Sequence, residues 1–164
     1  HFNAVYLRAL PPEDFARIAE PYIRQSVKNP AVDTAAVAAL LQARCERLTD
    51  IPEKVDFFDA LPDYDLALFT NKKSKTDADV SKAMLEAAVP ALEALPEWTQ
   101  EGVHDALIGL AEKLGVKNAT LMWPVRIAAA GKQVTPGGAV EICHILGREE
   151  TLRRLRLGLE KLAG

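Results

Sequence analysis

Few residues in this chain could carry out covalent chemistry, and their spacing does not assemble a catalytic or metal site. His1, His104 and His144 are scattered, and none belongs to an HxxxH pair with a supporting carboxylate. Cys143 and His144 are adjacent, and adjacent side chains on a helix point about 100° apart, which argues against a cysteine–histidine nucleophile. We therefore expect no catalytic residue and no metal site, and we interpret Cys143 as a small buried apolar residue.

The polar groups that are most sharply positioned by the sequence lie in Trp123–Gly147, WPVRIAAAGKQVTPGGAVEICHILG. A helix carrying Arg126 is predicted to stop at Gly131, and a second helix is predicted to open with Thr135 as N-cap and to stop at Gly147. A guanidinium only donates hydrogen bonds, whereas a threonine hydroxyl both donates and accepts. The turn would thus present two side chains of different hydrogen-bonding character.

The elements around this turn are predicted to be helices throughout. Alanine and leucine dominate, aromatic residues make up only 6%, and no segment alternates with period two. A polar, turn-rich stretch over residues 62–75 ends in NKKSK, and we take it as the boundary between two helical subdomains, residues 1–75 and 76–164. NKKSK is similar to a nucleotide-binding KMSKS loop, but no strand–helix nucleotide fold accompanies it, so we interpret it as a solvated loop.

One arginine is misplaced for an amphipathic helix. The helix predicted from Thr34 to about Leu48, capped by Asp33, places Arg44 beside its apolar stripe. Periodicity alone favours an aliphatic stem lying along that stripe with its charged end in water. Further N-caps are predicted at Thr76, for a helix that runs to about Leu95, and at Thr99, for the helix that follows and ends at Gly115.

The net charge of −3 hides a split between the two ends of the chain. Residues 1–112 carry 11 Lys/Arg against 19 Asp/Glu, whereas residues 113–164 carry 9 against 4. A basic end favours a polyanionic partner, and it contains Lys132 and three arginines that stand off the leucine seam of the last helix, Arg153, Arg154 and Arg156. These four side chains would contact phosphates or form a solvated helix face.

Composition also bears on the location of the protein. No apolar run reaches the roughly eighteen residues of a membrane span, and no signal peptide opens the sequence. Cys45 and Cys143 are far apart and are interpreted as reduced thiols of a cytoplasmic protein, with one bridge between them as the alternative. Because the first residue is not a methionine, the chain is expected to be a piece of a longer protein.

From Trp98 onward the order of features is distinctive: W-T, E-K-L-G-V-K, M-W-P-V-R-I-A-A-A-G, V-T-P-G and I-L-G-R-E-E-T-L-R-R-L. Earlier pieces agree, namely Asn3 with Tyr6-Leu7-Arg8, then Leu48–Lys54 and Phe57-Phe58. This order closely resembles the C-terminal anticodon-binding region of bacterial glutamyl-tRNA synthetases, over essentially the whole chain. The resemblance implies an all-α, two-part module of a class I synthetase, whose first part lies along the anticodon stem and whose second part holds the anticodon loop.

The same resemblance implies a catalytic domain upstream, absent from this chain, which would use ATP and Mg²⁺ to attach glutamate to tRNA(Glu). No cofactor is expected in the chain itself. The implied partners are tRNA(Glu) and the enzyme's own catalytic domain, with no DNA and no membrane, in a protein expected to be a cytoplasmic monomer.

The resemblance also assigns anticodon-reading positions. The family's "plR" arginine matches Arg126, the residue before the helix-start proline matches Thr135, and an arginine shortly before the "lPEK" segment matches Arg44. Another loop-contacting position is often a bulkier apolar residue in the family and is Gly138 here, so a side-chain contact is lost. The alternative for Arg126 is a purely structural role, in which the cation is stabilised by the helix dipole near the helix C-terminus. The alternative for Thr135 is that it acts only as an N-cap.

Donor-only arginine suits a cytosine, whose Watson–Crick edge offers two acceptors, and leaves opposed donors against a guanine. Because glutamate anticodons end in C and glutamine anticodons end in G, Arg44 would separate the two tRNAs. Threonine would suit the mixed edge of uridine. Two rival hypotheses stay open: a relaxed enzyme that also charges glutamine tRNA, and a helical protein-interaction scaffold that binds no RNA.

Overall fold

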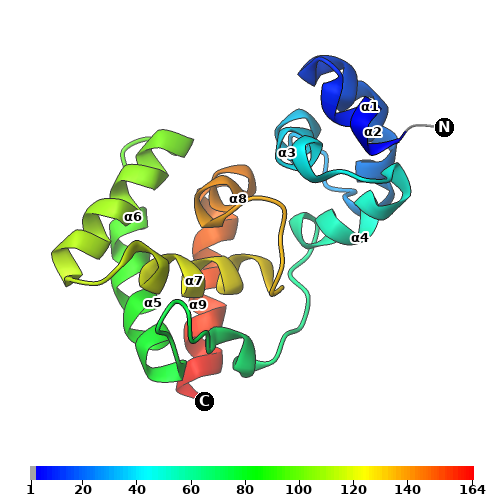
Figure 1. Ribbon diagram of the computed structural model, residues 1–164. Helices are drawn as coiled ribbons and strands as arrows, with labels where there is room; N and C mark the ends of the chain where they lie inside the picture. Colours follow the sequence, from blue (N-terminus) through cyan, green and yellow to red (C-terminus); the bar gives the residue numbers. More distant parts are fainter. Residues whose placement is uncertain (1–2) are drawn as a thin grey trace. The chain divides into compact units, whose positions relative to one another are not determined.

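The computed structural model describes residues 3–164, and within them it is built from helices (Figure 1). The α-helices are α1 (Ala4–Ala9), α2 (Pro12–Ser26), α3 (Thr34–Leu41), α4 (Ile51–Val55), α5 (Ala78–Glu93), α6 (Gln100–Leu114), α7 (Asn118–Ala130), α8 (Ala139–Leu146) and α9 (Arg148–Ala163). Four 3₁₀ turns accompany them, η1 (Gln42–Arg44), η2 (Leu48–Asp50), η3 (Asp56–Phe58) and η4 (Leu66–Phe69). These residues contain no strand, and one isolated bridge joins Asn71 to Thr76. The predicted all-α fold is confirmed.

The described chain divides into two compact units. The first contains residues 3–60 together with Val134–Gly137, and the second contains Leu61–Gln133 and Gly138–Gly164. Composition had placed the division at residue 75, whereas the structure places it fifteen residues earlier, between Ala60 and Leu61. The segment after Leu61 packs with the second unit because the Trp123 indole N–H bonds the Leu68 carbonyl and the Thr120 hydroxyl bonds the Ser74 carbonyl.

In the first unit, α2 packs against α3 and α4. Its core is made of fully buried apolar side chains, among them Leu7, Phe15, Ile23, Val37 and Phe57. Asp33 caps α3 as predicted, accepting from the Ala35 N–H at 3.0 Å. The helix is shorter than predicted, because after Leu41 the chain tightens into η1 and Cys45 is extended with φ −74° and ψ 121°. The side-chain amide of Gln42 bonds the carbonyls of Leu7 and Leu10, which ties this turn to the end of α1.

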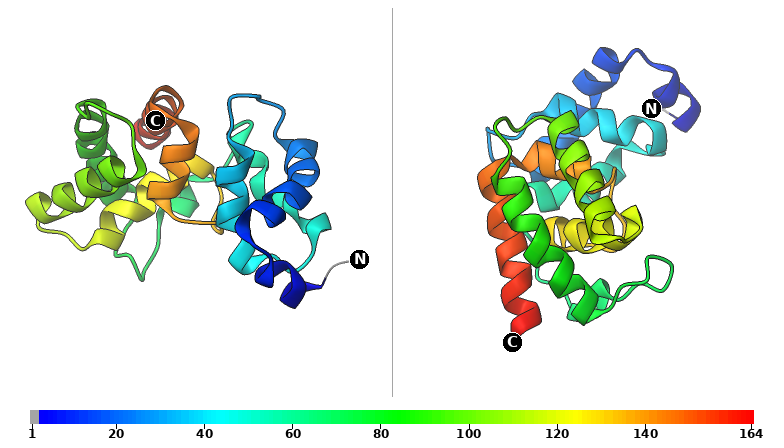
Figure 2. Two further views of the ribbon diagram at one scale, coloured as in Figure 1. Left: turned by 90° about the horizontal axis from the view of Figure 1, so that it is seen from above. Right: turned by 90° about the vertical axis from the view of Figure 1, so that its left-hand side faces the viewer.

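In the second unit, α5 and α9 lie side by side, and α7 packs against both of them (Figure 2). Helix α6 contacts α5, α7 and α8. Thr99 caps α6 as predicted, accepting from the Gly102 N–H at 2.9 Å. The predicted cap at Thr76 is wrong: Asp77 caps α5, while the buried Thr76 hydroxyl donates to the Phe69 carbonyl at 2.7 Å. Thr76 thus closes the preceding loop instead of opening the helix.

Two further observations concern the molecule as a whole. Within residues 3–164, none of the helices has both the length and the apolar character required to cross a membrane. Cys45 and Cys143 are both buried free thiols. Burial raises the pKa of the Cys143 thiol to about 12, so it is protonated at neutral pH.

Candidate nucleic-acid interface

Arg44 lies on the first unit at the end of η1, outside α3. Its side chain is exposed, and no hydrogen bond or ion pair to it is present within the described residues. The expected position along an apolar helix stripe is therefore wrong, since the helix that would carry that stripe ends at Leu41. The five N–H donors of this guanidinium are available to a ligand.

Arg126 lies half-buried in the last turns of α7, on the second unit. Its Nη1 donates to the Lys132 carbonyl at 3.2 Å and its Nη2 donates to the Gln133 carbonyl at 2.7 Å. The guanidinium also lies over the Trp123 ring, 4.7 Å from the ring centroid. Burial lowers the pKa of Arg126, yet a guanidinium stays charged at neutral pH. Arg126 therefore fixes the path of the chain just beyond the helix stop at Gly131.

The prediction that Thr135 is an N-cap is wrong. Helix α8 begins at Ala139, with Gly138 as its N-cap. Gly137 has φ +75°, a left-handed conformation that interrupts the right-handed path from Thr135 into the helix. Thr135 is buried and its hydroxyl donates to the Gly137 carbonyl at 2.9 Å, so it shapes the turn that precedes the helix.

Gly138 provides its backbone to the start of α8. Its N–H donates to the Glu141 carboxylate at 3.2 Å, which is the carboxylate half of a capping box. A Cβ at Gly138 would lie 3.7 Å from the Glu141 carboxylate, an ordinary contact. The position thus accepts a side chain, although here only backbone groups are present.

Arg154 contradicts its assignment to a solvated or phosphate-contacting face, because its side chain is completely buried. Its Nη1 donates to the Ala129 carbonyl and its Nε donates to Glu150, both at 2.7 Å. The spacing of the leucines predicts that only one side of α9 is buried. In the structure α5, α7 and α8 all pack against this helix, so more of its surface is buried. Burial lowers the pKa of Arg154 even though Glu150 opposes that shift, and the group stays charged.

The other two arginines of α9 are exposed but paired with carboxylates. Arg153 makes two hydrogen bonds to Glu150, at 2.9 and 2.7 Å, and Arg156 pairs with Glu93 at the end of α5. The bonds from Arg153 and Arg154 lower the pKa of Glu150 to about 2. The face predicted to meet phosphates is thus largely neutralised within the chain. Contact of Arg153 and Arg156 with phosphate stays a prediction.

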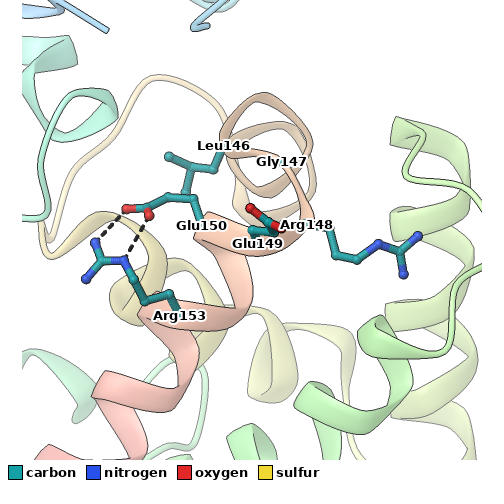
Figure 3. A pocket seen from close by; sticks show the side chains of 6 residues that line it. All are labelled: Leu146, Gly147, Arg148, Glu149, Glu150 and Arg153. Carbon is teal, nitrogen blue, oxygen red and sulfur yellow. Dashed lines mark hydrogen bonds and ion pairs between the residues drawn. The ribbon is translucent and has the colours of Figure 1, made fainter.

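A pocket of about 600 Å³ opens where α8 meets α9, lined by Leu146, Gly147, Arg148, Glu149, Glu150 and Arg153. Figure 3 shows the Glu150 carboxylate facing the Arg153 guanidinium, while Arg148 points away from that pair. Arg148 donates to the Glu93 carbonyl at 3.1 Å and lies over the Trp98 ring. Both arginines of the pocket are engaged and two carboxylates line it, so the pocket is poorly suited to an anion.

Some of the predicted residues contact one another, and the predicted base-reading residues are divided between the two units. Arg126 bonds the backbone of Lys132, and Arg153 shares Glu150 with Arg154. Arg44 and Thr135 belong to the first unit, whereas Arg126 belongs to the second. Sequence interpretation overlooked Trp123 as the partner of Arg126, although their i, i+3 spacing on a helix is a signal for such a contact.

Metal binding has no support among the residues that can be described. In residues 3–164 no group of three or more His, Cys, Asp or Glu side chains could hold a metal ion. His1, which was considered with the other histidines, lies outside the described residues.

Comparisons with known proteins identify several relatives of this chain. Clostridium tetani has a glutamate–tRNA ligase that is 45% identical over 160 residues, which is 98% of this chain and 33% of the relative. The glutamate–tRNA ligase of Clostridium acetobutylicum is 39% identical over 160 residues, again 98% of this chain and 33% of the relative. The chain spans about a third of the length of these curated relatives.

Solved structures support the fold. A glutamate tRNA ligase from Elizabethkingia meningosepticum, in complex with its amino acid, matches with a TM-score of 0.78 at 21% identity, covering 98% of this chain and 31% of that one. A glutamate–tRNA synthetase from Elizabethkingia anophelis matches with a TM-score of 0.74 at 20% identity, covering 96% and 30%. The family model described as an anticodon binding domain matches residues 14–159. The chain therefore belongs to the anticodon binding domain family.

Proposed function

We propose that this chain is the anticodon-recognising part of a glutamate–tRNA ligase, which attaches glutamate to tRNA(Glu) at the expense of ATP. The observation that carries the proposal is sequence similarity over nearly the whole chain. The chain is 45% identical to a portion of the Clostridium tetani ligase that makes up 33% of that protein. In this proposal residues 1–75 lie along the anticodon stem and residues 76–164 hold the anticodon loop, and Arg44 is the base-reading residue that the first part contributes. The protein acts as a monomer in the cytoplasm, contacts its own catalytic domain, and binds neither DNA nor membranes.

Substrate activation belongs to the rest of the enzyme. ATP and Mg²⁺ would be held by the catalytic domain of the full-length ligase, since this chain spans about a third of the length of its curated relatives. The contribution of this chain is to bind tRNA and to select its anticodon.

Arg44 would read the third anticodon base. Its exposed guanidinium has no partner within the described residues, so its donors can meet the O2 and N3 acceptors of cytosine. A guanine there would oppose donor to donor and leave unpaired groups that cost on the order of 1–3 kcal/mol. Discrimination against a glutamine-type anticodon would then be roughly tenfold to a hundredfold.

Arg126 and Thr135 would contact the other anticodon bases. Two N–H groups of Arg126 already donate to the carbonyls of Lys132 and Gln133, and its half-buried guanidinium lies over the Trp123 ring. Thr135 is buried, with its hydroxyl on the Gly137 carbonyl. Contact between Thr135 and a base would therefore need the turn at Thr135–Gly137 to open, or would involve the backbone of that turn.

The test uses the full-length ligase with Arg44→Gln and compares kcat/KM for tRNA(Glu) with that for the same tRNA carrying a final G in its anticodon. The ratio should fall by about tenfold or more. The matched control is Arg47→Gln, an exposed arginine three residues on that pairs with Asp50 at 3.3 Å. Unchanged discrimination with Arg44→Gln would remove Arg44 from the proposal and favour a relaxed enzyme that also charges tRNA(Gln).

A further inference from the structure

A loop of the second unit presents three cations that nothing in the described chain neutralises. The lysine loop, Asn71–Thr76, carries Lys72, Lys73 and Lys75, all exposed. Within residues 3–164 no ion pair or hydrogen bond to any of their ammonium groups is present, in contrast to the paired arginines of α9. The loop projects from the second unit in the right-hand view of Figure 2.

The backbone of the lysine loop is held in one conformation by hydrogen bonds. Asn71 and Thr76 exchange backbone bonds of 3.1 and 3.0 Å, and the Ser74 N–H donates to the Asn71 side chain at 2.8 Å. Lys75 has φ +59°, the one positive φ among the described residues that are not glycine. Such a conformation costs about 1–2 kcal/mol for a residue with a side chain, and it persists because the surrounding bonds determine it.

The same loop is fastened to the helix that carries Arg126. The Thr120 hydroxyl donates to the Ser74 carbonyl at 2.8 Å. Thr120, Trp123 and Arg126 follow one another at i, i+3 spacing on one side of α7. With a rise of about 1.5 Å per residue, Thr120 and Arg126 are separated by about 9 Å along the helix axis.

Nearby charges leave the loop basic. Lys117, the N-cap of α7, is exposed and lies three residues before Thr120. Asp77 and Asp79 follow the loop, but the Asp77 carboxylate accepts from the Val80 N–H at 2.8 Å and caps α5. The Asp77 charge is therefore directed at the positive end of the helix dipole, while the lysines face solvent.

We propose that the lysine loop, together with Lys117, is a phosphate-binding surface for the RNA strand whose bases Arg126 contacts. This inference rests on the proposed function, because it takes tRNA as the ligand. The three loop lysines and Lys117 are point charges on long stems, which suits sequence-independent contact with phosphates. The loop thus fixes the position of the RNA backbone and contributes no sequence selectivity.

The test compares binding of tRNA(Glu) to the 164-residue chain and to a triple variant, Lys72→Gln/Lys73→Gln/Lys75→Asn, as a function of salt. Asparagine at residue 75 removes the charge and tolerates the left-handed backbone. The control removes two unpaired lysines elsewhere in the second unit, Lys82→Gln/Lys113→Gln, and is compared with Lys72→Gln/Lys73→Gln. Circular dichroism and thermal unfolding establish that each variant is folded.

For the triple variant, the slope of log affinity against log salt should become shallower by about 2 to 3, which is about one for each lysine. The ratio of affinities for anticodons ending in C and in G should not change, because phosphate contacts carry no base information. An unchanged slope, or an equal change in the control, would overturn the inference while leaving the proposed function intact. A flat salt response of the unaltered chain would also overturn the inference, because it would remove the electrostatic part of binding, whereas failure to bind tRNA(Glu) at any salt concentration would count against the proposed function itself.

Discussion

The guanidinium of Arg154 donates a 2.7 Å hydrogen bond to the carbonyl of Ala129, from a side chain with no solvent exposure. Ala129 lies in the last turn of α7, where carbonyls have no partner within the helix. Arg154 of α9 therefore supplies a hydrogen-bond donor to a carbonyl at the end of α7, the helix that carries Arg126. This contact gives Arg154 a structural role in positioning the end of α7.

Replacing Arg154 with methionine should destabilise the second unit. The change leaves the Ala129 carbonyl buried without its donor, at a cost of about 1–3 kcal/mol. The measurement is urea unfolding of the 164-residue chain, with Arg153→Gln as the control. Because Arg153 is exposed, its ion pair should contribute only about 0–1 kcal/mol. Equal losses for the two variants would contradict the role of Arg154.

Gly131→Ala should be more harmful than Gly115→Ala, although both glycines end helices with left-handed backbones, φ +65° and φ +70°. A Cβ at Gly131 would lie 3.0 Å from the Tyr64 ring and 3.1 Å from the Pro62 carbonyl oxygen, whereas Gly115 faces open space. We expect a loss of about 1–2 kcal/mol at Gly115 from the backbone alone, and at least about 1 kcal/mol more at Gly131 from overpacking. Thermal unfolding of both variants provides the comparison, and similar Tm values would argue against the predicted clash.

Arg126→Met should loosen the chain beyond Gly131. Methionine can still lie over Trp123, but the bonds to the Lys132 and Gln133 carbonyls are lost. Amide hydrogen exchange over residues 132–138 should accelerate, by roughly tenfold for each 1.4 kcal/mol of lost local stability. The control is Gln133→Ala, which leaves the Gln133 carbonyl in place and should exchange at the original rate. Unaltered exchange in Arg126→Met would mean that residues 132–138 are held by other contacts.

Stability should depend on the charge of Glu150 in acid. Its pKa is lowered from an ordinary value of 4.5 to about 2, first by its hydrogen bond from Arg153. A carboxyl with a depressed pKa in the folded state stabilises that state fully above pH 4.5, and the contribution disappears as the pH falls from about 4.5 towards 2. Glu150→Gln should therefore be less stable than the original chain at pH 7, and the difference should shrink progressively below pH 4.5. A difference independent of pH would show that the ionised carboxylate is not the source.

Local signals in the sequence determined many helix ends. The caps Asp33 and Thr99 are confirmed, as are the stops at Gly131 and Gly147, because caps and left-handed glycines act through neighbouring backbone groups. The order of motifs over the chain was also sufficient to indicate the family, and the matched family model confirms it.

Contacts between distant residues decided the rest. Arg154 was placed on a polar face because its periodicity sets it off the leucine seam, yet α5, α7 and α8 enclose more of α9 than one seam. The polarity of residues 62–75 predicts a boundary, but Trp123 and Thr120 donate hydrogen bonds to carbonyls of this stretch and hold it in the second unit. Thr135 looked like an N-cap, but the left-handed Gly137 delays α8 until Ala139. The burial of a side chain and the hydrogen-bond partners of a backbone group depend on which elements pack together. Local sequence patterns do not contain this information.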